Sequence, residues 1–240
     1  MSIYVYNSRV CYDDIDGQMR LTLRGAMGHM QEAAILHSSL CGYSIGDIER
    51  TRVLWMLVQW RARLVGTACW NDDLTVNTWP RTMERLTSVR NFEIFGQDHQ
   101  LVAVGESNWV LVSADTGRPT RITPEVAAAY DLSDRDVFDT SLPKLSKEYG
   151  ILASKFVVGR RDLDTNCHVN NRVYLDYALE ALPDELSAEH FPEVSVRYHQ
   201  QLLHGDPVQC WYRKQGTCHI VDICGEERAR VHATVVFYET

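Results

Sequence analysis

The 240 residues of this chain repeat one series of structural elements, and this repetition restricts the fold more than any other feature of the sequence. In each series a short extended segment precedes an apolar helical run, and longer segments rich in β-branched and aromatic residues follow it. The first series predicts strands at 3–12, 54–65, 73–79, 88–95 and 101–112 and a helix at 25–40. The second predicts strands at 152–158, 194–203, 207–214, 217–224 and 228–238 and a helix from 170 to about 182.

A helix followed by several long antiparallel strands favours an α+β unit in which a curved sheet wraps around the helix. The second helix fits such an enclosure, because Asp176 and Glu180 alone interrupt its apolar run between Val173 and Leu182. Two such units suggest a pseudo-dimer, and two unrelated α+β domains are the competing interpretation. The predicted boundaries are a first domain at 1–122, a linker at 123–150 with a short helix at 124–130, and a second domain at 151–240.

Charge and composition narrow the class of protein. The formal net charge of −8 excludes general binding of nucleic acid, since phosphate contacts need a basic surface. No apolar run approaches the roughly 20 residues of a membrane span. The start of the chain lacks the features of a signal peptide, so the expected location is the cytoplasm. The seven cysteines are scattered and include no Cys-x-x-Cys pair, which favours reduced thiols over disulfides or a zinc site.

Residues suited to catalysis crowd together just before the second predicted helix. The segment 160–171 reads Arg-Arg-Asp-Leu-Asp-Thr-Asn-Cys-His-Val-Asn-Asn. Asp164, Asn166 and His168 occupy alternate positions, so in an extended segment their side chains point the same way and converge on one small volume. A carboxylate, an amide and an imidazole at this spacing indicate a catalytic site. Helix capping by the asparagines and core packing by the histidine are the alternative.

The start of that helix adds a second part to the candidate site. With a helix from Asn170 onward, the backbone N–H groups of Val169 and Asn170 lack partners within the helix and are suited to an oxyanion. One such donor contributes about 3 kcal/mol to an oxyanionic transition state. We therefore predict an oxyanion hole at these two residues.

A family resemblance rests on the same segment. The acyl-acyl carrier protein (acyl-ACP) thioesterases of the bacterial type have a signature that resembles residues 161–171, followed by Tyr-Leu-Asp-Tyr at 174–177. Further blocks of the first half resemble the family: Met-Gln-Glu-Ala-Ala at 30–34, Thr-Trp-Pro at 78–80, Ser-Asn-Trp-Val-Leu at 107–111 and Arg-Pro-Thr-Arg-Ile at 118–122. The blocks cover most of the chain in the right order, which makes the resemblance specific.

The resemblance implies a tandem (double) hot-dog fold of the α+β class, in which each half is a curved antiparallel sheet wrapped around a central helix. It implies that the first half holds the acyl chain, that the second half carries the chemistry, and that neither a cofactor nor a metal takes part. The implied reaction is hydrolysis of a fatty acyl-ACP thioester to free fatty acid and holo-ACP. The implied partner is an acyl carrier protein with its acyl chain linked through 4'-phosphopantetheine.

Asp164, Asn166 and His168 match the catalytic Asp, Asn and His of the family. The family's Glu falls at Gln201, or with less support at Gln200. Gln can hold water but cannot take its proton at neutral pH. We therefore expect Asp164 and His168 to share the basic role. Whether Asp164 is a general base or a nucleophile that forms an anhydride stays open.

Two other nucleophiles fit the pattern less well. Cys167 follows Asn166 directly, so alternation in an extended segment points its thiol away from the polar face. A Ser-His-Asp hydrolase is disfavoured, because the Gly-x-Ser-x-Gly sequence at 42–46 follows a predicted helix and precedes a strand, whereas a nucleophile elbow needs a strand before it and a helix after it.

Substrate-binding residues are expected in both halves. Met27, Met30 and Trp55 are predicted to line the acyl pocket, although core filling explains them equally well. An acidic carrier needs a local basic patch on this acidic chain. The candidates are Arg81, Arg85, Arg90, Arg118, Arg121, Arg160, Arg161 and Arg172, of which we expect Arg160, Arg161 and Arg172 to bind the carrier.

Three other functions stay open. The same site would serve an acyl-CoA thioesterase. A hot-dog dehydratase or hydratase would need a His and a carboxylate aimed at carbons 2 and 3 of the acyl chain, which the Asp-x-Asn-x-His order fits less well. A non-catalytic acyl-thioester binding protein is made credible by Gln201. No nucleic acid and no membrane span are expected, and a homodimer is left open.

Overall fold

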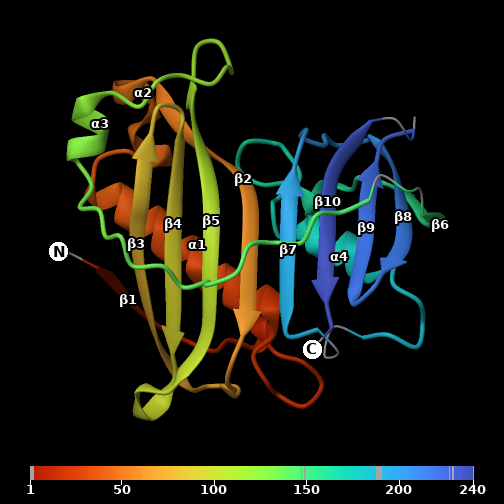
Figure 1. The fold of residues 1–240 in the computed structure, drawn as a ribbon. Helices are drawn as coiled ribbons and strands as arrows, with labels where there is room; N and C mark the ends of the chain where they lie inside the picture. The colour runs from red at the N-terminus through yellow and green to blue at the C-terminus, as the bar shows by residue number, and fades with distance from the viewer. Residues whose placement is uncertain are drawn as a thin grey trace. The chain divides into compact units, whose positions relative to one another are not determined.

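The chain forms two compact units in the computed structural model, which describes residues 3–146, 148, 150–187, 191–226, 228 and 230–239. The units are Met1–Thr140 and Ser141–Thr240. Within each unit a helix lies across one face of an antiparallel sheet, α1 in the first and α4 in the second (Figure 1).

Unit 1 contains β1 (Tyr4–Arg9), η1 (Tyr12–Asp14), α1 (Leu23–Leu40), η2 (Ile45–Asp47), α2 (Ile48–Thr51), β2 (Val53–Leu64), β3 (Asp73–Glu84), β4 (Thr87–Phe95), η3 (Gln97–His99), β5 (Leu101–Ser113) and α3 (Pro124–Ala128). Its strands pair in the order β1-β3-β4-β5-β2. Thr22 caps α1 by accepting the N–H of Gly25 at 3.0 Å. A Cβ on Gly25 would lie 2.6 Å from the Cβ of Asp14, so glycine is needed where η1 packs on the helix.

Unit 2 contains β6 (Ile151–Val157), η4 (Arg160–Asp162), α4 (Val173–Leu179), β7 (Glu193–Tyr198), β8 (Pro207–Gln215), β9 (Cys218–Cys224) and β10 (Val231–Tyr238). Its strands pair in the order β6-β8-β9-β10-β7. If the five strands of each unit are numbered along the chain, they pair in the order 1-3-4-5-2 in both units. The predicted repetition of one α+β unit is therefore confirmed.

Several elements of unit 2 are shorter than the sequence predicts. The helix expected at 170–182 begins at Val173, because the Asn170 side chain accepts the N–H of Arg172 at 3.0 Å in a turn of its own. The strand expected at 194–203 ends at Tyr198, since the next two residues both donate their N–H groups to the carbonyl of His232. The strand expected at 228–238 begins at Val231, and residue 229 lies outside the described residues.

Residues 123–140, predicted to be the first part of a linker, pack within unit 1. The short helix expected at 124–130 forms as α3. The chain then crosses the face of the sheet that lies away from α1 (Figure 1). There the Trp79 indole donates to the carbonyl of Arg135 at 2.9 Å, and Arg61 donates to Thr140 while its guanidinium lies 3.9 Å from the Phe138 ring. These contacts hold the segment as part of unit 1.

Each unit has its own apolar core. In unit 1 the largest fully buried side chains include Trp60, Trp79 and Phe92. In unit 2 they include Phe191 and Phe237, whose ring centroids are 5.2 Å apart. None of the described helices is both long and apolar enough to cross a membrane.

Candidate functional site

The predicted catalytic residues lie on one tight turn of unit 2, which we call the 163–169 turn. Leu163 and Val169 form an antiparallel bridge at its base. The N–H of Asp164 donates to the carbonyl of His168 at 2.8 Å, and Cys167 has a φ of 60°. The segment is therefore not extended. The alternation of side chains expected from the sequence is wrong here, and it no longer argues against a role for the exposed thiol of Cys167.

The carboxylate of Asp164 holds this turn. Its Oδ1 accepts the N–H of Asn166 at 2.8 Å and the N–H of His168 at 3.2 Å. An aspartate side chain that accepts nearby backbone N–H groups stabilises such a turn. Asp164 thus has a structural task in addition to any chemical one.

Several polar groups on the 163–169 turn form no hydrogen bond within the part of the chain that the structure describes. Among the described residues, no hydrogen bond involves Oδ2 of Asp164, the ring nitrogens of His168 or the side-chain amide of Asn166. Asp164 and His168 are half-buried, and Asn166 is exposed. One carboxylate oxygen, one imidazole and one amide are therefore available to a bound substrate or water.

The segment that contains Gln201 lies beside this turn. His168 forms an antiparallel bridge with Leu203, and the N–H of Val169 donates to the carbonyl of Leu202 at 2.9 Å. The side chain of Gln201 is exposed and has no hydrogen bond among the described residues. The structure thus brings the backbone of Gln201 next to the turn that carries the other three predicted catalytic residues.

The predicted oxyanion hole at Val169 and Asn170 is wrong. The N–H of Val169 is used by Leu202, and the N–H of Asn170 donates to the carbonyl of Asp162 at 2.8 Å. The prediction failed because the helix begins at Val173, so these two amides belong to the turn and its bridges and not to an open helix end.

Unit 1 contains a turn of the same construction at 15–21. Oδ1 of Asp16 accepts the N–H of Gln18 at 2.8 Å and the N–H of Arg20 at 2.9 Å. Residues 15 and 21 form the bridge at its base, and Met19 has a φ of 60°. Arg20 bridges Cys69 as His168 bridges Leu203. Asp16, Gln18 and Arg20 therefore stand where unit 2 has Asp164, Asn166 and His168.

The surrounding hydrogen bonds repeat as well. Three bonds from a backbone N–H to a backbone carbonyl have equivalents in the two units. In unit 1 they are Val10 to Asp72, Leu21 to Ala68 and Thr22 to Asp14, and in unit 2, in the same order, they are Val158 to Asp206, Val169 to Leu202 and Asn170 to Asp162. The spacing Asp-Ile-Asp at 14–16 and Asp-Leu-Asp at 162–164, each just before a helix, is the signal that could have revealed this pair of turns. In unit 1 the Arg20 guanidinium pairs with Asp16 at 3.0 Å, so that turn lacks both the imidazole and an uncommitted carboxylate.

The three arginines predicted to bind the carrier flank the 163–169 turn. Arg160 and Arg161 are exposed on η4, and Arg161 lies 3.7 Å from Asp162. Arg172 precedes α4 and is half-buried. Among the described residues, neither Arg160 nor Arg172 forms an ion pair.

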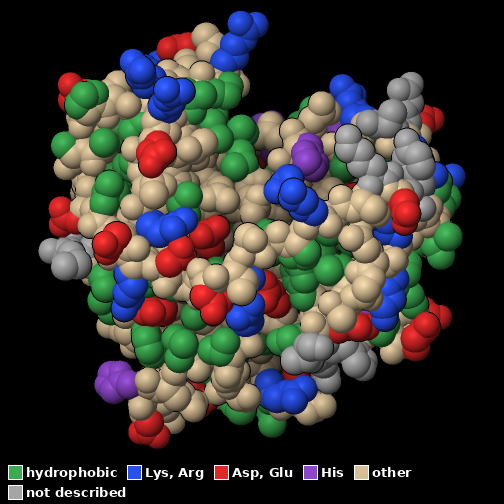
Figure 2. Space-filling model, in the orientation of Figure 1, with side chains coloured by type: hydrophobic (Ala, Val, Ile, Leu, Met, Phe, Trp, Pro, Cys, Tyr) green, Lys and Arg blue, Asp and Glu red, His purple; other side chains and the backbone are tan. Residues whose placement is uncertain are grey.

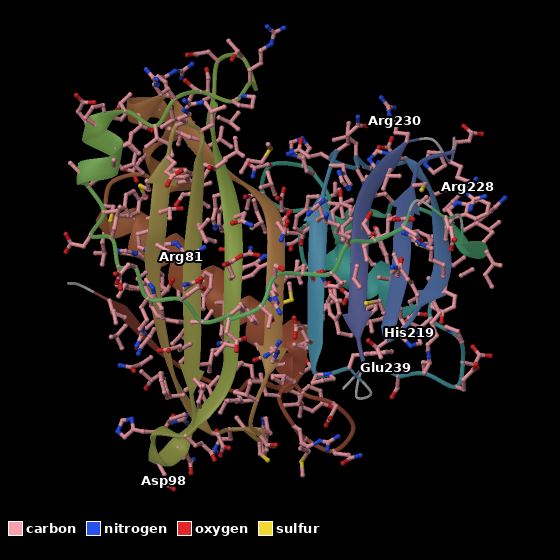
Figure 3. The ribbon with its side chains drawn as sticks, in the orientation of Figure 1. Arg81, Asp98, His219, Arg228, Arg230 and Glu239 are labelled. Carbon is pink, nitrogen blue, oxygen red and sulfur yellow. The ribbon has the colours of Figure 1, made fainter. Side chains whose placement is uncertain are left out.

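Two of the other arginine candidates are already engaged in unit 1. Arg81 pairs with Asp136 at 2.6 Å and lies 3.7 Å from Glu106, whose carboxyl pKa is raised by burial (Figure 3). Arg90 is buried and lies next to His37. On the face drawn in Figure 2, basic and acidic side chains are interspersed.

Arg90 and His37 form a buried pair between β4 and α1. Nη1 of Arg90 lies 2.9 Å from Nδ1 of His37 and donates to the hydroxyl of Thr78 at 3.2 Å. Burial, together with the charge of Arg90, lowers the pKa of His37 to about 4. Burial also lowers the pKa of Arg90 to about 10. His37 is therefore neutral at pH 7 and accepts from the guanidinium.

The residues predicted to bind the acyl chain all lie in unit 1. Met27 and Met30 are fully buried on α1, and a Cβ on Gly105 would lie 2.5 Å from Sδ of Met30. Trp55 is half-buried, and its indole donates to the hydroxyl of Tyr130 at 3.1 Å. Contact with the sheet and with Tyr130 accounts for their packing, and their role toward a substrate stays a prediction.

Other titratable groups gather at the ends of β9 and β10. Nε2 of His219 lies 2.7 Å from Oε1 of Glu239, and its Nδ1 lies 2.9 Å from the hydroxyl of Tyr212 (Figure 3). Hydrogen bonds from Lys214 and His219 lower the carboxyl pKa of Glu239. In the described part of the chain, no group of three or more His, Cys, Asp or Glu side chains is placed to hold a metal ion.

Models of two protein domains match the chain. The acyl-ACP thioesterase N-terminal domain matches residues 2–130, and the acyl-ACP thioesterase C-terminal domain matches residues 146–234. Together they cover both units.

Curated relatives include acyl carrier protein thioesterases of plants. The oleoyl-acyl carrier protein thioesterase 2 of Arabidopsis thaliana is 26% identical over 200 residues, which are 75% of this chain and 54% of that protein. The palmitoyl-acyl carrier protein thioesterase of Cuphea hookeriana is 25% identical over 203 residues, or 78% of this chain and 49% of that protein. The chain therefore spans about half the length of the curated relatives it matches.

Solved structures share the fold over nearly the whole chain. An acyl-ACP thioesterase from Bacteroides thetaiotaomicron is 19% identical with a TM-score of 0.88, covering 99% of this chain and 98% of that one. A 12:0-ACP thioesterase from Umbellularia californica is 18% identical with a TM-score of 0.83, covering 99% and 97%. The predicted double hot-dog fold is confirmed. With two matched domain models, the fold they share and the turn at 163–169, the chain belongs to the acyl-ACP thioesterase family.

Proposed function

We propose that this chain hydrolyses the thioester of a fatty acyl-ACP and releases a free fatty acid and holo-ACP. The observation that carries the proposal is the 163–169 turn, found in a chain of this family. There one oxygen of Asp164, the imidazole of His168 and the amide of Asn166 form no hydrogen bond with any described residue. The relatives from Arabidopsis thaliana and Cuphea hookeriana are named as thioesterases of oleoyl- and palmitoyl-acyl carrier protein. Acyl chains on a carrier protein are accordingly the first substrates to test.

In the proposed reaction a water molecule attacks the thioester carbonyl. Oδ2 of Asp164 and the imidazole of His168 share the proton that the water loses, and Gln201 holds the water by hydrogen bonds. The tetrahedral intermediate then collapses, the carbon–sulfur bond breaks, and the pantetheine thiolate takes up a proton. If Asp164 attacks directly, the same groups hydrolyse the resulting anhydride.

The oxyanion needs donors other than the two amides first predicted. The side-chain NH₂ of Asn166 is an exposed donor on the same turn as Asp164, and an N–H of His168 is a second. We assign the oxyanion to these two side chains, because Val169 and Asn170 already donate to backbone carbonyls. Once the bound substrate holds them in place, donors of this kind contribute about 3 kcal/mol each to the transition state.

Binding of the carrier is assigned to Arg160, Arg161 and Arg172. They lie immediately before and after the turn, and a phosphopantetheine arm brings an anionic carrier close to the thioester that it delivers. The first unit is proposed to hold the acyl chain near Met27, Met30 and Trp55. A homodimer and a cytoplasmic location stay predictions, and light scattering after size-exclusion chromatography checks the first of them.

The test is a panel of thioesters assayed by release of free thiol. Purified protein is incubated with acyl-ACP of several chain lengths, with the matching acyl-CoA esters, and with 3-hydroxyacyl-ACP. Release of holo-ACP thiol at a higher kcat/KM than release from acyl-CoA supports the proposal. Faster turnover of acyl-CoA assigns the alternative thioesterase, loss of water from the 3-hydroxyacyl substrate assigns a dehydratase, and binding without turnover assigns a binding protein.

A further inference from the structure

One peptide group beside the 163–169 turn is held at both of its ends by side chains. This is the peptide between Gln201 and Leu202. Its carbonyl accepts the Nδ1–H of His232 at 3.2 Å, and its N–H donates to the hydroxyl of Tyr174 at 3.1 Å. A carbonyl oxygen only accepts, so Nδ1 of His232 carries the hydrogen.

Both side chains are rigidly placed. Tyr174 is 2% exposed on α4, and His232 is 5% exposed on β10. The Tyr174 ring packs edge-on against Tyr198 with centroids 5.4 Å apart. Burial raises the pKa of Tyr174 to about 12, and the charges of Asp206 and Asp164 act in the same direction, so the hydroxyl keeps its proton at neutral pH and lies within electrostatic reach of Asp164.

Unit 1 lacks half of this arrangement. The equivalent peptide lies between Thr67 and Ala68, and its carbonyl accepts from Nε2 of Gln100 at 3.1 Å. The helix position that corresponds to Tyr174, counted from the turn, is Ala26, which has no hydroxyl. Among the described residues, no side chain accepts the N–H of Ala68. The second anchor is therefore found in the unit whose turn carries the His and the uncommitted carboxylate.

We propose that Tyr174 and His232 are positioning residues that fix the Gln201–Leu202 peptide and thereby aim the Gln201 side chain at the water held by the 163–169 turn. An exposed glutamine has several rotatable bonds, so its amide is directed only if its backbone is fixed. Leu202 also accepts from Val169, which ties the same peptide segment to the residue after His168. The inference rests on the proposed function.

The test combines single variants with a matched control. Tyr174→Phe removes only the hydroxyl. Tyr198→Phe removes the hydroxyl of a half-buried tyrosine, which donates to the carbonyl of Asn171 at 2.9 Å and not to this peptide. His232→Asn keeps an N–H donor near the position of Nδ1, and His232→Leu removes it. Thermal unfolding midpoints, kcat and KM are measured on the acyl-ACP that the wild type hydrolyses fastest.

We expect Tyr174→Phe and His232→Leu to lower kcat about tenfold with KM within about twofold, since the hydrogen bonds act on positioning and not on substrate binding. His232→Asn should recover most of the lost kcat. Tyr198→Phe should change the unfolding midpoint as much as Tyr174→Phe but leave kcat within about twofold.

A double-mutant cycle separates positioning from general loosening. In a Gln201→Leu background the substitution Tyr174→Phe should lower kcat less than twofold, because the group that it positions is gone. A further tenfold loss in that background, or wild-type kcat in folded Tyr174→Phe, overturns the inference and leaves the proposed function standing. Absence of thiol release by the wild type overturns the proposed function and the inference with it.

Discussion

Asp164 has a structural task in addition to the chemical one proposed for it. Its Oδ1 holds two backbone N–H groups of the turn, and its Oδ2 remains available. Asn in its place still presents Oδ1 to both N–H groups but cannot take a proton, whereas Ala presents no acceptor. The two substitutions therefore separate the tasks.

Asp164→Asn should lower kcat about 100-fold or more while the unfolding midpoint stays within about 2 °C of the wild type, because the turn is kept and the base is lost. Asp164→Ala should lower both kcat and the midpoint. The measurement is steady-state thiol release together with thermal unfolding followed by circular dichroism. Wild-type turnover in folded Asp164→Asn would remove this carboxylate from the chemistry.

Gln201 is the residue at which the resemblance to the family predicts a Glu. Gln201→Glu should keep the enzyme active or make it faster, because a carboxylate holds water and also accepts its proton. A second carboxylate near Asp164 should also raise an apparent pKa and move the acidic limb of the pH–rate profile upward. Gln201→Leu should be slow across the range. Profiles of the three forms on one acyl-ACP decide the matter, and a leucine variant equal to the wild type would exclude a catalytic role.

Burial of His37 should make the free energy of unfolding depend on pH. Burial lowers its pKa from 6.5 to about 4, so between these values the unfolded state binds more protons than the folded state. The free energy of unfolding should therefore fall as the pH is lowered from about 6.5 toward 4. Urea unfolding at several pH values measures this slope. His37→Gln keeps an acceptor for Arg90 and should show a shallower slope, and an unchanged slope would contradict the assignment.

At the scale of elements, strands and helices were predicted more reliably than their ends. Alternating and periodic apolar residues located α1 and each strand, since burial on one face imposes those periods. The sequence does not predict the start of α4, because the Asn170 side chain accepts a backbone N–H there. It does not predict the end of β7 either, because the carbonyl of His232 accepts the next two backbone N–H groups. These hydrogen bonds form within local turns or between strands far apart in the sequence. The periodicity of apolar residues therefore does not predict them.

Sequence periodicity also fails to predict how the candidate site is held together. Asp164, Asn166, His168 and Gln201 were located from residue types and family resemblance. The turn that holds them, its copy in unit 1 and the contacts of Tyr174 and His232 depend on which backbone groups meet. The prediction of the oxyanion donors is wrong for the same reason. A helix predicted to begin three residues too early gives two backbone N–H groups with no expected hydrogen-bond acceptor.

The arginines of the short helix η4 are predicted to bind the acyl carrier protein. Arg160→Glu with Arg161→Glu should raise KM for acyl-ACP at least tenfold and change KM for the matching acyl-pantetheine much less, since reversed charges repel only the acidic protein. The effect on acyl-ACP should shrink at high salt. Arg118→Glu with Arg121→Glu, on exposed residues of unit 1, is the matched control. Equal effects on both substrates would mean that the η4 arginines support the site and do not dock the carrier.

At the scale of the whole molecule, the chain holds two copies of one unit of which one carries the proposed chemistry. The two turns share their bridges, their aspartate acceptor and the left-handed residue, and they differ in the side chains that they present. Such a pair offers an internal control that a single site does not. Equivalent substitutions disturb the same backbone construction in both units but remove reactive groups in only one.

The most direct test compares His168→Ala with Arg20→Ala. The measurement is the initial rate of holo-ACP thiol release from saturating acyl-ACP, with folding of each variant checked by its unfolding midpoint. His168→Ala should lower kcat about 100-fold or more, the range of lost acid–base function, and Arg20→Ala should stay within about twofold of the wild type. Wild-type turnover in His168→Ala, or an equal loss in both variants, would contradict the assignment of hydrolysis to the turn of unit 2.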